Sequence, residues 1–223
     1  MTEFRRVLFR SNAAVSKPFL RHTLAVAGLD VALRLAQRSH PHITLLHRQA
    51  LHDAIAASHR PLSRGFGLTA MIRPAGGSER AAKTVVTDLP VGLAFPDGSR
   101  RHFLFEWDTG SESIAPQSPA ARGSANIVDK LVTYQTAWTA REHAARYGWQ
   151  SFAVPIITAS PKRAQNILAL IRSHDLLRNS RLFLVTDRAS LAASPDLFAH
   201  AWQTRTGTPA TLVPPELLSA LPL

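Results

Sequence analysis

Residues 102–113 read HFLFEWDTGSES, an aromatic stretch that carries two carboxylates and ends in a Gly-Ser turn. Side chains alternate between the two faces of a β-strand, so a strand here places three rings, Phe103, Phe105 and Trp107, opposite Glu106 and Asp108. Three rings on one face predict a buried strand, and buried carboxylates need a partner. Two interpretations remain open: Arg or Lys neighbours neutralise the acids, or the acids form a metal or acid/base site.

The bulk composition is that of a soluble globular protein, with 45% hydrophobic and 18% charged residues. A length of 223 residues favours one well-buried domain. No apolar run reaches the roughly 18 residues of a membrane helix, so we expect no membrane segment. The absence of cysteine excludes disulfides, thiolate metal sites and cysteine nucleophiles, and the ten histidines show no zinc-site spacing. We therefore expect a cytoplasmic protein.

Positive charge is concentrated in the first part of the chain. Of the formal net charge of +11, most arises before Thr84, where 13 Lys and Arg face 4 Asp and Glu; the remainder holds 13 against 11. Neutralising phosphates is the commonest use of such an excess. This distribution predicts a polyanion partner, namely DNA bound without sequence preference through the basic N-terminal half.

The two ends differ from the rest. Residues 1–11 read MTEFRRVLFRS, and LFRS resembles the translated end of a common sequencing adaptor, so we expect a non-native segment. The alternative, a targeting peptide, lacks the apolar region and the cleavage site that such peptides carry. We assign residues 12–205 to a single domain and residues 206–223 to a Pro-rich tail, expected to be extended and loosely held.

The N-terminal part predicts two helices and a short strand. Residues 19–37 have an apolar stripe at three- and four-residue steps, typical of an amphipathic helix with that stripe packed inward. The stripe consists of Leu20, Leu24, Ala27, Val31 and Leu35. Residues 43–46 are expected to form a strand and residues 48–57 a helix, whereas residues 58–83, rich in Gly and Pro, are expected to form loops.

The next part predicts a hairpin, a long helix and a βαβ unit. Residues 84–95, with a possible break at Pro90, and residues 101–108 pair across an Asp97-Gly98 turn. A helix capped by Ser124 runs to about residue 146, where Gly148 ends it. Strands at 152–158 and 181–186 flank a helix at 162–172, and a short helix is expected near 197–202. Pro155 predicts an edge position or a bulge for the first of these strands.

This order of elements resembles the PD-(D/E)XK restriction-endonuclease-like core, an α/β fold whose mixed sheet joins an antiparallel hairpin to a parallel βαβ part flanked by helices. The segments PVGLAF (90–95), FLFEWDTGSE (103–112) and KLVTY (130–134) resemble the plasmid replication-relaxation proteins. That family carries a Pro-Asp strand, a Glu-x-Asp-x-Gly-(Thr/Ser)-Glu strand end and a Lys-Leu-x-x-Tyr helix. Its members usually begin with a winged-helix domain, which this chain lacks, and the resemblance spans about residues 22–202.

The resemblance implies a catalytic constellation of Glu106, Asp108 and Lys130. Glu106 and Asp108 would bind Mg²⁺, which prefers hard oxygen ligands, and Lys130 would reach back from its helix to Glu106. The alternative for Lys130 is a solvated helix residue paired with Asp129 or Glu142. Val91 stands where the pattern places an Asp, which implies weakened or lost catalysis. Core packing is the expected role of Tyr134.

Three functions follow from the sequence. The first is a DNA-associated replication-relaxation protein of a plasmid or mobile element, with a nuclease-like fold and weakened or lost catalysis. The second is an active Mg-dependent DNA endonuclease or nickase. The third is a non-enzymatic regulator or assembly module that binds a partner, such as plasmid replication or mobilisation proteins, and whose winged-helix DNA-binding head is expected to be missing from this chain.

Overall fold

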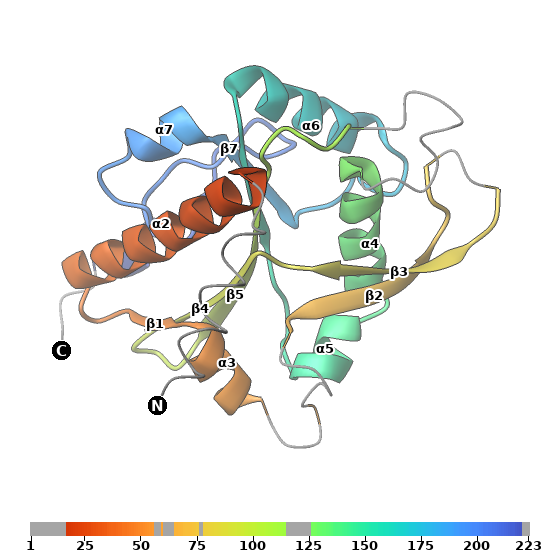
Figure 1. Ribbon diagram of the computed structural model, residues 1–223. Coiled ribbons are helices and arrows are strands. Elements are labelled where there is room, and N and C mark those ends of the chain that lie inside the picture. The colour runs from red at the N-terminus through yellow and green to blue at the C-terminus, as the bar shows by residue number, and fades with distance from the viewer. Residues whose placement is uncertain (1–16, 56–58, 60–64, 76–77, 115–125, 220–223) are drawn as a thin grey trace, which may run out of the picture.

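The computed structural model describes residues 17–55, 59, 65–75, 78–114 and 126–219. They form a mixed α/β fold in which helices cover both faces of a five-stranded sheet of order β1-β4-β5-β6-β7 (Figure 1). The expectations for residues 1–11 and for Ser124 lie outside these ranges. Within them, none of the helices combines the length and the apolar character needed to cross a membrane.

Strand β5 joins an antiparallel half of the sheet to a parallel half. β1 (Thr44–Leu46), β4 (Leu89–Ala94) and β5 (Arg100–Trp107) are antiparallel neighbours. β6 (Val154–Thr158) lies parallel to β5, and β7 (Phe183–Asp187) lies parallel to β6. The predicted hairpin followed by a parallel βαβ unit is confirmed.

Two hydrophobic cores lie on the two faces of this sheet. The α4 layer contains Leu104 of β5 and the inner faces of helices α3, α4 and α6. The α2 layer contains Phe103 and Phe105 of β5, the inner face of α2 and part of the C-terminal segment. The alternation of β5 is therefore as predicted, and the side chain of residue 106 belongs on the α4 layer's face.

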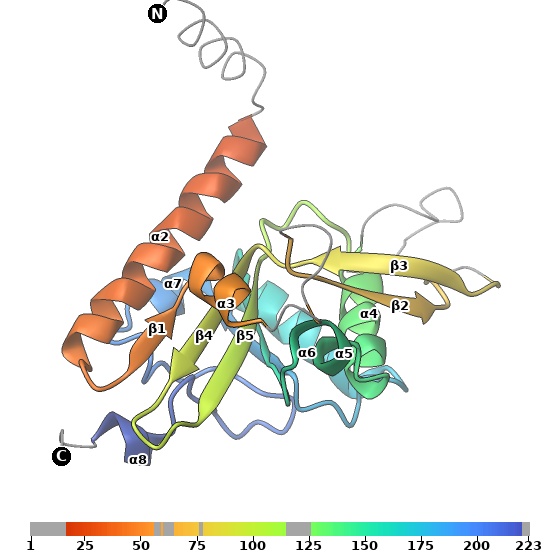
Figure 2. The same cartoon turned by 90° about the horizontal axis from the view of Figure 1, so that it is seen from below.

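The strand expected at residues 84–95 is two strands that belong to different sheets. β3 (Ala81–Val86) pairs with β2 (Gly67–Ile72) in a two-stranded ribbon that packs on α4, and β4 starts at Leu89 (Figure 2). The break thus lies at residues 87–88 rather than at Pro90. The prediction of loops for residues 58–83 was wrong at residues 67–72 and 81–83, which form strands: Leu68, Ala70 and Ile72 alternate into the α4 layer, although Gly and Pro flank them.

The turn between β4 and β5 follows the predicted chemistry. Gly98 has φ of 81°, a backbone angle that favours glycine, and the Asp97 carboxylate accepts a hydrogen bond of 2.9 Å from the backbone N–H of Ser99. The turn fixes the register in which Val91 lies opposite Phe103.

Helix α2 (Lys17–Ser39) forms as expected, but with the opposite face inward. Its buried residues are Leu29, Leu33 and Ala36, whereas the predicted inward stripe is exposed. The sequence of α2 places apolar residues on two faces of the helix, and only the shorter of these faces packs against the sheet. Helix α3 (Arg48–Ala54) buries Leu51 in the α4 layer, as predicted.

The long predicted helix is split into α4 (Ile127–Thr139) and α5 (Glu142–Tyr147). Arg141, with φ of 56°, separates them, and Gly148, with φ of 69°, ends α5 as predicted. Helix α4 is buried on most of its sides and also packs against the β2–β3 ribbon, while Trp138 near its end is 40% exposed.

Pro155 lies in the middle of the sheet, so the edge position expected for β6 was wrong. The β5–β6 pairing consists of a bridge between Phe103 and Ala153 and a ladder that begins at Glu106 and Ile156. Pro155 lies in the interruption, where its missing N–H leaves no ladder bond to break. Helix α6 (Pro161–Ser173) then crosses back to β7 over the α4 layer.

The C-terminal segment is held more closely than its prolines predict. The helix expected near residues 197–202 is absent from the described structure at those positions; α7 (Arg188–Ala192) follows β7 instead, capped by Asp187. Leu212 and Val213 are buried in the α2 layer, and α8 (Pro215–Leu218) follows them. The segment after Thr206, expected to be loosely held, thus contributes to the core.

Candidate functional site

Glu106 is a buried carboxylate at the end of β5 on the α4 layer's face. Its side chain is 5% exposed. The aromatic strand holds it there, because the alternation that buries Phe105 in the α2 layer turns Glu106 toward α4. A charge at this depth requires compensation from neighbouring groups.

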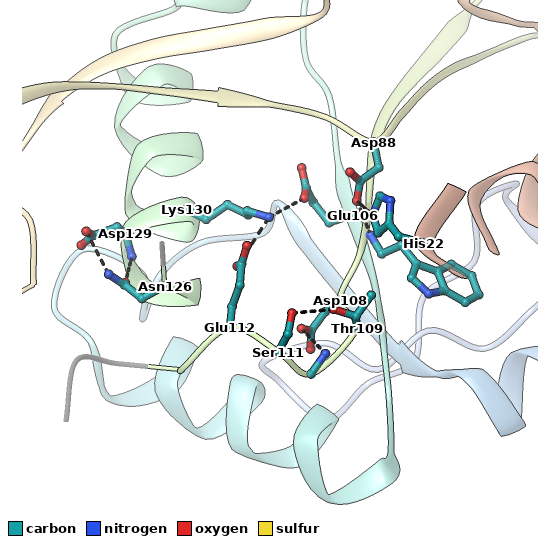
Figure 3. A network of polar contacts seen from close by, with 12 residues as sticks. His22, Asp88, Glu106, Asp108, Thr109, Ser111, Glu112, Asn126, Asp129 and Lys130 are labelled. Atoms are coloured by element: carbon teal, nitrogen blue, oxygen red, sulfur yellow. Dashed lines mark hydrogen bonds and ion pairs between the residues drawn. The ribbon is translucent and has the colours of Figure 1, made fainter. Parts of the chain in front are cut away.

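Helix α4 supplies that compensation through two residues one turn apart. Lys130 Nζ donates to Glu106 Oε2 at 3.0 Å (Figure 3). The Tyr134 hydroxyl donates to Glu106 Oε1 at 2.5 Å. Residues i and i+4 share one face of a helix, so both side chains point at the same strand position. The prediction that Lys130 reaches back to Glu106 is confirmed. Tyr134 is fully buried and has a polar partner in addition to its packing.

The three side chains of this cluster have pKa values shifted from their ordinary values. Burial raises the pKa of Glu106 to about 7; Lys130 opposes this shift and Asp88 adds to it. Burial lowers the pKa of Lys130, but the carboxylates of Glu106 and Glu112 outweigh it and leave that pKa raised. Burial, followed by the charge of Glu106, raises the pKa of Tyr134 well above its ordinary value. Lys130 and Tyr134 therefore keep their protons at neutral pH, while Glu106 titrates there.

Asp108 has a different cationic partner, on helix α6. The Arg163 guanidinium makes a bidentate contact with the carboxylate, donating from Nε to Oδ2 and from Nη2 to Oδ1. Arg163 Nη2 also donates to the backbone carbonyl of Glu112 at 2.6 Å, which fastens the chain beyond β5. Gly110, with φ of 84°, turns the chain so that its N–H donates to Asp108 Oδ1 at 2.9 Å. With its side chain 4% exposed, Asp108 has both oxygens occupied.

Two further acids lie beside Glu106. Glu112 approaches Lys130 Nζ at 3.8 Å, so Lys130 lies between two carboxylates (Figure 3). Asp88, in the break between β3 and β4, accepts a 2.7 Å hydrogen bond from the backbone N–H of Trp107 and contacts His22 Nε2 at 3.2 Å. Its effect on the pKa of Glu106 places Asp88 within electrostatic reach of the site.

The predicted place of the missing acid needs correction. Val91 is 2% exposed and lies in the α2 layer opposite Phe103, so its side chain points to the face away from Glu106. An acid at position 91 would not meet Glu106. Asp88 is the acid of the β4–β5 hairpin that does interact with it.

The donor set does not fit the Mg²⁺ ion that the resemblance implied. In the part of the chain that the structure describes, no three His, Asp or Glu side chains are arranged to hold a metal ion. Mg²⁺ needs near-octahedral oxygen ligands. Glu106 already accepts from Lys130 and Tyr134, and Asp108 from Arg163. Of the two interpretations of this acidic pair, the arrangement matches neutralisation by Lys and Arg neighbours.

Sequence reasoning brought together Glu106, Asp108 and Lys130 but did not find Arg163. Glu106 and Lys130 meet directly, whereas Asp108 shares the strand but has its own partner. Arg163 lies 55 residues beyond Asp108. Its position opposite Asp108 follows from the crossover between β6 and β7, which no local spacing encodes.

The comparisons with known proteins identify the family alone. No curated protein and no solved structure matches this chain. The family model described as replication-relaxation matches residues 1–151, which is more than half of the 223 residues and includes the hairpin, Glu106, Asp108 and α4. The chain therefore belongs to the replication-relaxation family.

Proposed function

We propose that this chain serves the replication of a plasmid or other mobile element as a cytoplasmic, DNA-associated protein built on a PD-(D/E)XK-like scaffold that does not cut DNA. The observation that carries this proposal is the pairing of Glu106 with Lys130 and of Asp108 with Arg163. The order α2, hairpin, α4 and parallel β6 supports the scaffold assignment, and family membership supports the role in replication.

The absence of cutting follows from the strength of these pairs. A metal ion would have to displace the Lys130 ammonium from Glu106 and the guanidinium of Arg163 from Asp108. Each displacement gives up a hydrogen bond to a charged group, which is worth about 1.5–3 kcal/mol. A hydrated Mg²⁺ ion, which gives up its own water reluctantly, gains little from one or two carboxylates in return.

A plasmid-nicking assay tests this part of the proposal. Supercoiled plasmid is incubated with the protein and Mg²⁺ or Mn²⁺, with Glu106→Gln as the site variant and Asp175→Asn, an exposed acid in the C-terminal half, as the control. We expect the three proteins to show the same background. Wild-type nicking that persists in Asp175→Asn and is lost in Glu106→Gln would overturn the proposal.

DNA association is expected to come from the basic surface before Thr84. On the described residues, the β2–β3 ribbon and its flank carry Arg73, Arg80 and Lys83, of which both arginines are exposed. Phosphate contacts release counterions, so log affinity should fall with log salt at a slope of about −0.9 per contact on duplex DNA. The proposed partners, plasmid replication or mobilisation proteins, would meet the chain on this DNA.

Anisotropy titrations of a labelled duplex at several salt concentrations measure the slope. Replacing Arg73, Arg80 and Lys83 with alanine should weaken binding and make the slope shallower by up to about 2.7, if all three contact phosphate. Replacing Arg172, Arg178 and Arg181 of the C-terminal half should change neither quantity. Salt-independent binding, or equal losses from the two triple variants, would contradict this placement of the DNA surface.

A second candidate, a Mg-dependent endonuclease, is favoured by the position of Asp88. This acid interacts electrostatically with Glu106, so the hairpin does contribute a carboxylate beside it. An endonuclease using this pair would lose metal-dependent nicking in both Asp88→Asn and Glu106→Gln. Loss in Glu106→Gln alone would leave Asp88 with its observed role, which is to accept the Trp107 N–H at the end of β5.

A further inference from the structure

Helix α2 exposes an apolar stripe on the side opposite its packed face. Leu20, Leu24, Val31 and Leu35 are 52%, 63%, 54% and 54% exposed, and Ala27 between them is exposed as well. Figure 2 shows the N-terminal half of α2 extending beyond the rest of the fold. These residues are apart from Glu106 and from the ribbon, so the proposed function uses none of them.

The stripe is symmetric about its own centre. Counting from the midpoint between Ala27 and Gly28, Leu20 and Leu35 lie at equal distances, and so do Leu24 and Val31. At about 100° per residue, all of these positions fall within one narrow sector of the helix surface. A second α2 helix placed antiparallel across this midpoint would therefore set Leu20 against Leu35, Leu24 against Val31, and Ala27 against Gly28.

We propose that this stripe is the interface of a homodimer, in which the α2 helices of two copies of this chain pack antiparallel. A two-fold interface uses the same patch on both partners and so requires self-complementarity, which the order of residues in α2 provides. The two small residues at the centre let the helix axes approach closely, while the larger residues fill the space on either side.

Gly28 supports this arrangement independently. Glycine in a helix interior is destabilising relative to alanine, and a Cβ added at Gly28 would meet nothing within 4 Å among the residues that the structure describes. The described part of one copy thus gives no packing reason for glycine at this position. In the antiparallel pair, the two copies of residue 28 lie beside the two-fold axis, where the helix axes approach each other most closely.

The charges of α2 give this dimer a characteristic salt dependence. In the same register, Lys17 lies near Arg38 of the other copy, so each end of the interface brings two positive charges together. Arg21 and Arg34, which have matching heights, fall on opposite flanks of the stripe and stay apart. Salt screens like charges and strengthens burial of apolar surface, so dimerisation should increase with salt, whereas DNA binding decreases.

Sedimentation equilibrium of the full chain tests the dimer. We expect a monomer–dimer equilibrium whose dissociation constant falls as salt is raised. Leu24→Glu places like charges in the apolar interface, so its dissociation constant should be at least about tenfold higher than that of the wild type. Leu176→Glu, an exposed leucine away from α2, should leave the constant unchanged. Equal melting temperatures of the variants would show that folding is intact. A wild type that is monomeric at every concentration, or that dimerises equally well as Leu24→Glu, would overturn the proposal.

The absence of cysteine from the chain allows the register to be tested separately. Under mild oxidation, Ala27→Cys should form a disulfide-linked dimer, because the two copies of residue 27 flank the two-fold axis. Leu20→Cys alone should not, whereas the double variant Leu20→Cys, Leu35→Cys should. Efficient cross-linking of Leu20→Cys alone would indicate parallel helices and refute the antiparallel arrangement, and no cross-linking of Ala27→Cys would refute the interface.

Discussion

Replacing Lys130 with methionine isolates the charge that compensates Glu106. Methionine keeps an unbranched side chain of similar reach but has no ammonium group. Glu106 would keep its bond from Tyr134, while the charge 3.0 Å from Oε2 would be gone. Because Glu106 is buried, the cost should depend on whether its carboxyl is ionised.

The loss of stability caused by Lys130→Met is therefore expected to change with pH. Burial raises the pKa of Glu106 to about 7 from 4.5, so below pH 4.5 the group is protonated in both the folded and the unfolded state. As pH rises through 7, the folded protein must ionise a buried group, and the stability associated with its protonation is lost. At about pH 5 the variant should lose only a hydrogen bond, about 1 kcal/mol. At about pH 8 it leaves a buried carboxylate unpaired, and this carboxylate can instead take up a proton at a cost of about 1.4 kcal/mol, one pH unit above the pKa of about 7. Together with the lost hydrogen bond, the total loss at this pH should be about 2–3 kcal/mol.

Urea unfolding followed by tryptophan fluorescence at the two pH values measures both costs. Lys162→Met, at an exposed lysine on α6, is the matched control and should change stability by less than about 0.5 kcal/mol. In the double variant with Glu106→Gln, the added cost at the higher pH should largely disappear. An equal cost at both pH values, or a cost no larger than the control's, would refute the idea that Lys130 compensates an ionised Glu106.

Three further variants probe the same region. Val91→Asp should lower stability by at least about 3 kcal/mol without creating nuclease activity, because it buries an unpaired carboxylate in the α2 layer; Val86→Asp, at a 57% exposed position, is the control in the same urea titration. Arg163→Leu should cost about 3–5 kcal/mol by leaving Asp108 unpaired, and if Arg163→Lys restored full stability, the bidentate contact would be unimportant. Tyr134→Phe should cost about 1 kcal/mol and move the loss of stability near pH 7 to higher pH, because the hydroxyl donor favours ionised Glu106 and its removal raises the pKa of that carboxyl; an unchanged pH profile would contradict this.

The parts of the fold that were predictable are those encoded by local spacing. The period of two over residues 101–108 predicted which side chains of β5 share a face, and the Asp97-Gly98 turn predicted its antiparallel partner. The spacing of Lys130 and Tyr134 follows from one helical turn. These features depend on neighbours within a few residues, where periodicity carries the information.

The parts that could not be predicted depend on how distant elements meet. The two apolar faces of α2 have nearly the same periodicity, and only the tertiary structure selects Leu29 and Leu33 for burial. The alternation of β2 was concealed by flanking Gly and Pro. Asp88 was assigned to a continuous strand, because a change of sheet within a β-rich run leaves no signal in its composition.

The same two carboxylates can serve catalysis or structure, and the positive charges fixed around them decide which. A metal site leaves its acids short of donors, so that a divalent ion completes their coordination. Here α4 contributes Lys130 and Tyr134 to Glu106, α6 contributes Arg163 to Asp108, and Arg188 donates to the backbone carbonyl of Asp108 at 3.3 Å. These contacts join the end of β5 to three other parts of the chain. The charges that would otherwise attract a metal ion thus fasten two helices and the start of α7 to the central strand, which is the reason to seek DNA association on the basic outer surface instead of at this cluster.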